Sequence, residues 1–234
     1  ALYDSLTTAF VIWSLFLLVL WLIIYTSIFT DEGRREMRVV SSWGVLLGFS
    51  QFLFVPLYWR PQSLFGLSAR SGLDIESFIF AFCIAGIASV IYEWFFNVKH
   101  EMLFADKDWG YTLTAIIPAP VLFLALILFT NTNPIYSASI SLLVGAFTVG
   151  YERRDLIKKI LVGGILFALF YIAILFVLTT IYRDFLLTAL NLSILSAGGT
   201  VADIPWSQII FPLSYGFFFA GIYEYVFRRR LVSK

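Results

Sequence analysis

Two acidic residues, Asp74 and Glu76, open a long apolar stretch of the sequence and are candidates for proton chemistry. Four aromatic residues stand close to them in the chain: Tyr58, Trp59, Phe78 and Phe80. An acid that such rings partly remove from water would be kept protonated, which is the state a general acid needs. We therefore expect Glu76 to be the general acid of a site lined by these four aromatic side chains.

A structural interpretation of the same pair is equally open. Ser71 stands three residues before Asp74, a spacing that resembles a capping box at the start of a helix. Asp74 would then cap the helix, and Glu76 would interact with the positive end of the helix dipole. In the second half of the chain the matching stretch is Pro205-Trp206-Ser207-Gln208, with Asp203 just before it. We add Asp203 to the catalytic candidates and Trp206 to the residues expected to line the site.

Three further acids, Glu93, Glu152 and Glu224, each follow a tyrosine at the end of an apolar run. Tyrosine at that depth is usual for a residue anchored at a membrane interface. Glu224 can also pair with Arg228 one helical turn later. We interpret all three acids as structural.

Metal and cofactor sites have little support in the sequence. The single cysteine, Cys83, lies within an apolar run, and we expect the single histidine, His100, to stand in a polar loop. Cysteine-based and histidine-rich metal sites are thereby excluded, and no phosphate-binding loop or flavin or nicotinamide fingerprint is present. We expect neither a metal nor a cofactor.

The composition identifies the class of protein. Of 234 residues, 60% are hydrophobic and only 13% are charged, with 25 phenylalanines. A soluble domain is about one quarter charged and could not hide so much apolar surface. Disorder, a disulfide scaffold and a nucleic-acid-binding protein are excluded as well. The sequence predicts an all-α polytopic membrane protein formed by one domain over residues 1–234.

Seven apolar runs are long enough to consider as membrane spans. They cover residues 6–29, 39–59, 74–96, 111–130, 134–151, 157–181 and 205–227. With seven spans, all Lys and Arg residues except Arg60, Arg70 and Arg183 lie on one side of the membrane. The positive-inside rule makes that side cytoplasmic. We expect a multi-pass protein of the cell membrane, with its N-terminus outside and its C-terminus in the cytoplasm.

The sequence also contains a weak internal repeat. Arg34-Arg35-Glu36 matches Arg153-Arg154-Asp155 at an offset of 119 residues, and Ile91-Tyr92-Glu93 matches Ile222-Tyr223-Glu224 at an offset of 131. Phe80 and Phe211 share the second offset. These matches predict two parallel three-helix repeats, residues 1–97 and 134–234, joined by a linker helix within 98–133. A binding site is then expected where the repeats meet.

The motifs of the first repeat resemble the lycopene cyclase domain family, small integral-membrane carotenoid cyclases of the tandem-repeat type. The resemblance rests on Pro56-Leu-Tyr-Trp59-Arg-Pro61-x-x-Leu-Phe65, on Asp74-Ile-Glu76-Ser-Phe78-Ile-Phe80 and on Tyr92-Glu93. In the pattern of this family two adjacent acids precede the aromatic residues. Here the two positions hold Glu76 and Ser77 in the first copy, and Ser207 and Gln208 in the second.

The resemblance implies an isomerase (intramolecular lyase) that closes rings on an isoprenoid without net redox change. A carboxylic acid would protonate a terminal double bond, the carbocation would close a ring, and a base would remove a proton. Glu76 is the matching acid, with Asp74 and Asp203 beside it. The expected partners are membrane lipid and a hydrophobic isoprenoid substrate, and the protein could act as a homo- or hetero-oligomer.

Two other functions remain open. A small-molecule transporter could be built on the same plan of three, one and three helices, and it would need a polar path at the middle of the membrane. A non-catalytic isoprenoid- or lipid-binding membrane protein is favoured by the missing acids at Ser77, Ser207 and Gln208.

Overall fold

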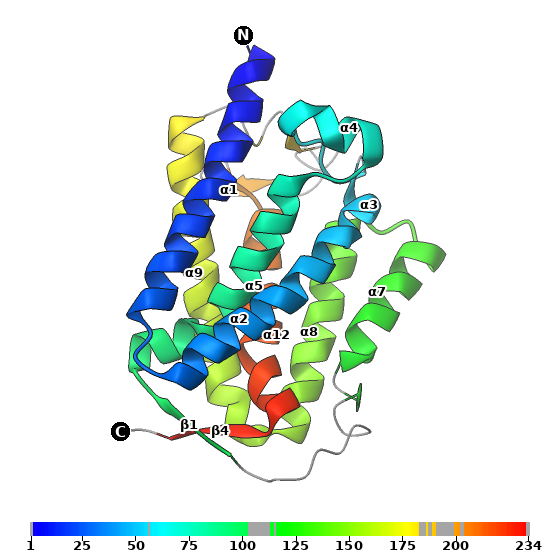
Figure 1. Ribbon diagram of the computed structural model, residues 1–234. Coiled ribbons are helices and arrows are strands. Elements are labelled where there is room, and N and C mark those ends of the chain that lie inside the picture. The colour runs from blue at the N-terminus through cyan, green and yellow to red at the C-terminus, as the bar shows by residue number, and fades with distance from the viewer. Residues whose placement is uncertain are drawn as a thin grey trace.

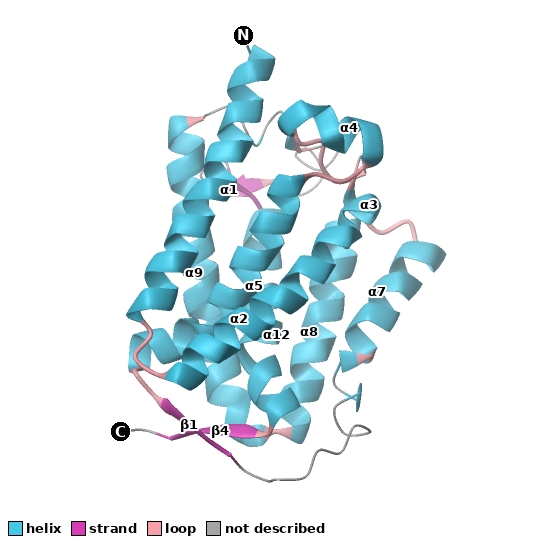
Figure 2. Cartoon of the chain, viewed as in Figure 1, coloured by secondary structure: helices cyan, strands magenta, loops and turns pink. Residues whose placement is uncertain are grey.

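The architecture was obtained as a computed structural model, which describes residues 2–55, 57–102, 113–114, 116–182, 186, 189–190, 199–201 and 204–232. Long helices dominate it (Figure 2). Six of them form the bundle: α1 (Leu2–Ser27), α2 (Asp31–Leu47), α5 (Ile75–Phe96), α8 (Pro134–Glu152), α9 (Ile157–Ile181) and α12 (Ser207–Phe227).

Shorter elements complete the fold. Helix α2 continues through a 3-10 turn at Gly48–Ser50 into α3 (Gln51–Phe54), and 3-10 turns also occur at Leu64–Gly66 and Arg154–Leu156. Two more helices are short: α4 (Leu67–Ser71) and α7 (Pro118–Phe129). The strands form two small antiparallel pairs, β1 (Lys99–Met102) with β4 (Arg229–Val232), and β2 (Thr200–Val201) with β3 (Ile204–Pro205).

The prediction of an all-α polytopic membrane protein is confirmed. Six segments among the described residues are helical, apolar and long enough to cross a membrane. Large apolar side chains point outward from them, for example Phe147 and Leu169, as a lipid environment allows. In the fourth predicted span, 111–130, the longest helix among the described residues is the 12-residue α7, so the count of seven spans stays a prediction.

Helix boundaries follow local capping signals. The second helix begins at Asp31, well before the predicted start at residue 39, because the Thr30 side chain accepts a hydrogen bond from the Gly33 backbone N–H (3.1 Å). The third long helix begins after Asp74, whose carboxylate accepts the Ser77 backbone N–H (2.7 Å). The predicted cap at Asp74 is therefore present.

Helices α5 and α12 form the centre of the bundle. Helix α5 packs against α1 and α2, helix α12 packs against α8 and α9, and the two central helices touch each other. Helix α7 lies at the edge beside α8 (Figure 1). The start of α1 and strand β4 lie at opposite ends of the bundle (Figure 1). We call the end that holds β1 and β4 the ribbon end.

Two pairs of structural features share the offset of 131 residues that the sequence repeat shows. Asn97 and Arg228 each end a central helix in the left-handed conformation, with φ of 50° and 51°. In the β1–β4 ribbon His100 stands opposite Leu231, its counterpart at the same offset. Antiparallel pairing of two equivalent residues is what a two-fold axis through the ribbon would produce. Division into repeats 1–97 and 134–234 stays a prediction that superposition of the halves would test.

Candidate functional site

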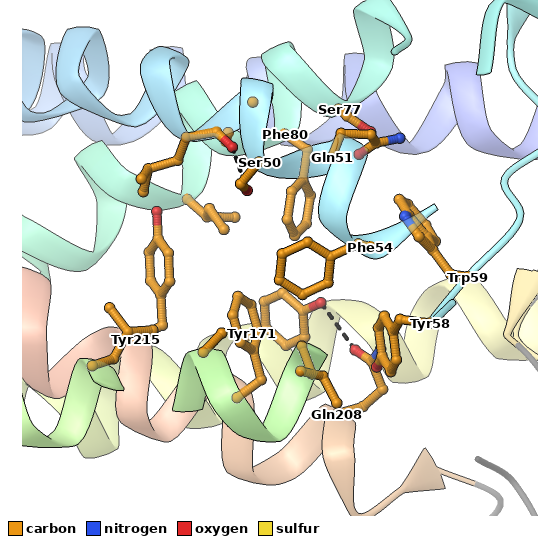
Figure 3. A pocket seen from close by; sticks show the side chains of 18 of the residues that line it. Ser50, Gln51, Phe54, Tyr58, Trp59, Ser77, Phe80, Tyr171, Gln208 and Tyr215 are labelled. Carbon is orange, nitrogen blue, oxygen red and sulfur yellow. Dashed lines mark hydrogen bonds between the residues drawn. The ribbon is translucent and has the colours of Figure 1, made fainter. Parts of the chain in front are cut away.

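A cavity of about 590 Å³ lies inside the helix bundle (Figure 3). Its size falls in the range of small-molecule sites, about 300 to 1,000 Å³. Residues from both predicted repeats and from α7 line it, and most are aromatic or aliphatic. The aromatic lining residues are Phe10, Trp13, Trp43, Phe54, Tyr58, Trp59, Phe80, Phe123, Tyr171, Phe211, Tyr215, Phe218 and Phe219.

Three polar lining residues, Tyr58, Tyr171 and Gln208, are joined by hydrogen bonds at the end of the bundle opposite the ribbon. The Gln208 side-chain N–H donates to the Tyr58 hydroxyl (2.6 Å), and Tyr171 donates to the Gln208 carbonyl oxygen (3.1 Å). The Tyr58 and Ser207 hydroxyls lie 3.2 Å apart. Burial raises the pKa of Tyr58 to about 12, although hydrogen bonds to Ser207 and Gln208 act in the opposite direction. Tyr58 therefore stays a neutral hydrogen-bonding group.

Asp74 lies directly behind the cavity wall. One of its carboxylate oxygens caps α5, and the other accepts a hydrogen bond from the Gln51 side-chain amide (2.5 Å). Gln51 and Ser77 both line the cavity, whereas Asp74 does not. Burial raises the pKa of Asp74, and hydrogen bonds from Ser77 partly offset that rise.

Glu76 is buried but does not line the cavity either. Its Oε1 accepts the Leu64 backbone N–H (2.7 Å), while its Oε2 has no hydrogen-bond partner among the described residues. The rotation of α5 about its axis turns Glu76 away from the cavity. Ser77, one residue later, lines the cavity.

Some of the other predicted site residues line the cavity, and others lie outside it. Tyr58, Trp59 and Phe80 line the cavity, as the sequence predicted. Phe78 does not, and instead makes an edge-on contact with the ring of Phe49. Trp206 lies outside the lining with 45% of its surface exposed. The predicted Asp203 lies outside the described residues.

The sequence positions that correspond in the two predicted repeats meet across the cavity. Ser77 and Gln208 share the offset of 131 residues and both line it, as do Phe80 and Phe211. The described lining residues include no carboxylate. A carboxylic acid from the described part of the chain could therefore reach a bound molecule only from behind the wall.

A second group of buried side chains lies at the ribbon end. We call it the ionic cluster; it consists of Glu36, Glu93, His100, Lys159 and Glu224. The Lys159 ammonium lies 3.1 Å from Glu36 Oε1 and 2.6 Å from Glu224 Oε1, and it also contacts Glu93 Oε1. His100 Nε2 lies 2.8 Å from Glu224 Oε1, 3.1 Å from Glu36 Oε2 and 3.7 Å from Glu93 Oε1.

This cluster corrects one expectation from the sequence. His100 belongs to strand β1 and its side chain is buried, so the expected polar loop is wrong. Glu224, for which the sequence suggested a pair with Arg228, contacts Lys159 and His100. Burial disfavours the charged imidazole, but hydrogen bonds with Glu224 and Glu36 outweigh it and raise the pKa of His100 to about 10. One feature of the sequence indicated this cluster. The repeated Tyr-Glu pair placed Glu93 and Glu224 at equivalent positions of the two predicted repeats.

Comparison of the chain with protein-family models, with curated proteins and with solved structures gives no match.

Proposed function

We propose that this protein is an integral-membrane isoprenoid cyclase of the lycopene cyclase type. The single observation that carries the proposal is the aromatic cavity among the helices of the bundle. A long apolar substrate could enter such a cavity from the surrounding lipid without crossing water. The apolar lining would keep water away from a reactive carbocation once the substrate fills the cavity.

The aromatic lining supports the chemistry as well as the binding. The side chains of Trp59, Phe80, Tyr171 and Tyr215 line the space that a substrate would occupy. Aromatic faces attract a cation, by about 2 kcal/mol or more when water is excluded. They would stabilise the positive charge that forms when a terminal double bond is protonated.

Two buried acids could supply the proton. Asp74 accepts hydrogen bonds from Gln51 and Ser77, which both line the cavity. Its raised pKa favours the protonated form. Glu76 holds one carboxylate oxygen without a hydrogen-bond partner among the described residues. Proton addition, ring closure and proton loss leave no net change in atoms or electrons, so the acid is restored in each cycle.

The test is expression of the chain in lycopene-producing cells, with analysis of the membrane pigments by liquid chromatography. The intact chain should yield cyclic products, and Glu76→Gln and Asp74→Asn should identify the acid by loss of those products. Glu101→Gln is the control, because Glu101 is half-exposed on β1 and pairs with Arg230. Cyclic products in the double acid variant would remove both acids from the mechanism.

A second candidate is a non-catalytic isoprenoid-binding protein. The specific observation in its favour is that the described lining of the cavity contains Ser77 and Gln208 but no carboxylate. This candidate predicts that unmodified lycopene co-purifies with the chain in place of cyclic products. It also predicts that Ser77→Glu, which sets an acid at the cavity wall, gains cyclisation that the parent lacks.

A further inference from the structure

The ionic cluster is not used by the proposed reaction, and acids outnumber bases in it by three to two. The side chains of Glu36, Glu224 and His100 are fully buried, and those of Glu93 and Lys159 are 3% and 1% exposed. An uncompensated charge at such a depth costs several kcal/mol, so a buried carboxylate either takes up a proton or binds a further cation.

Each carboxylate has an oxygen that Lys159 does not contact and that could bind a cation. Lys159 contacts the Oε1 atoms of Glu36, Glu93 and Glu224. The Oε2 atoms of Glu93 and Glu224 are buried and have no hydrogen-bond partner among the described residues, and Glu36 Oε2 lies 3.1 Å from His100 Nε2. A buried carboxylate oxygen without a partner is rare in a folded protein, because its desolvation is not compensated. Lysine alone thus leaves half of the acceptor atoms of the cluster unused.

The geometry fits a single ion. One ligand atom from each of Glu36, Glu93, His100 and Glu224 lies within 4.8 Å of the other three. Ligands arranged tetrahedrally at about 2.1 Å from one ion lie about 3.4 Å apart, so the side chains would close in on one another by up to about 1.4 Å when the ion binds. The four ligands come from α2, α5, β1 and α12, which hold them on separate parts of the backbone.

We propose that Glu36, Glu93, His100 and Glu224 bind one divalent transition-metal ion, and that Lys159 neutralises the remaining charge. A divalent ion that binds the imidazole displaces its proton, and the ion and the ammonium together then balance the three carboxylates. One imidazole and three carboxylates suit Zn²⁺, Mn²⁺ or Fe²⁺ better than a soft ion such as Cu⁺. Because the ligands are buried and all come from the protein, the site is structural and fastens the β1–β4 ribbon to the ends of α2, α5 and α12.

The experiment measures metal in the purified full chain. Since His100 is the single histidine of the sequence, the affinity tag must contain no histidine. Protein from cells grown with added zinc, manganese and iron is analysed by inductively coupled plasma mass spectrometry. We expect about one ion per chain, a loss of at least tenfold in His100→Gln and Glu224→Gln, and no change in Glu101→Gln, which alters the neighbouring residue of His100.

A second measurement uses the unaltered chain and so does not depend on variants that fold. After treatment with a chelator, addition of ZnCl₂, MnCl₂ or ferrous salt should raise the midpoint of thermal unfolding in detergent. Failure of all three ions to bind or to raise the midpoint would overturn the proposal, and so would an undiminished metal content in His100→Gln. These measurements are independent of pigment chemistry, so a negative result would leave the proposed cyclase untouched.

Discussion

Glu93 and Glu224, which belong to two different central helices, both contact the same Lys159 ammonium. They occupy matching positions at the ends of α5 and α12, and each directs a carboxylate oxygen at the Lys159 nitrogen. The lysine itself comes from α9. One buried side chain thus joins the central helices of the two predicted repeats, at the end of the bundle where the ribbon also connects them.

Removal of the Lys159 charge should destabilise the protein strongly. Lys159→Met leaves three buried carboxylates without their main counter-charge, and breaking a buried pair in this way costs about 3 to 5 kcal/mol. Thermal unfolding in detergent measures the effect. The control is Lys158→Met, because Lys158 is the exposed neighbour on the same helix and should unfold like the parent. Equal unfolding of the two variants would contradict the importance of the cluster.

The polar wall of the cavity should depend on Gln208. Gln208→Leu removes the donor to Tyr58 and the acceptor from Tyr171, which leaves two buried hydroxyls with fewer partners. We expect a loss of about 1 to 3 kcal/mol in the free energy of unfolding. Gln208→Glu keeps the shape and an acceptor for Tyr171, so the loss should be smaller if hydrogen bonding governs the effect. A larger loss in Gln208→Glu than in Gln208→Leu would show that apolar packing matters more.

Two substitutions can separate the helix-capping role of Asp74 from its proposed role as a proton donor. Asp74→Ala removes the acceptor for the Ser77 N–H and for the Gln51 amide, and it should cost about 1 kcal/mol or more. Asp74→Asn keeps a capping oxygen and should retain most of that stability. Circular dichroism during heating measures both variants. Identical midpoints for the two would mean that the cap contributes little.

The contact between α9 and α12 should not tolerate a methyl group at Gly164. A Cβ atom there would lie 2.0 Å from Phe217 Cδ1 and 2.8 Å from the Phe217 backbone nitrogen. The ring can move but the backbone cannot, so Gly164→Ala should cost about 1 to 3 kcal/mol. Gly150→Ala is the control, since its nearest contact would be an ordinary 3.6 Å. We expect a lowered unfolding midpoint in Gly164→Ala alone.

The sequence was sufficient to predict where these long helices lie along the chain. The run 134–151 became α8, Pro134–Glu152, and the run 157–181 became α9 with the same bounds. An apolar run long enough to cross the hydrocarbon must form a helix, because lipid offers no partners to its backbone groups. Residue spacing also predicted the cap at Asp74, since capping is a contact within a few residues.

Only the tertiary structure decided which side chains meet. The sequence could not tell that Ser77 rather than Glu76 faces the cavity, because one residue turns a side chain by about 100° around its helix and packing alone sets the rotation. Nor could it bring His100 to Glu36 and Glu224, which stand 64 and 124 residues away along the chain. Those contacts exist because the β1–β4 ribbon folds back under the bundle, and that pairing depends on the whole chain.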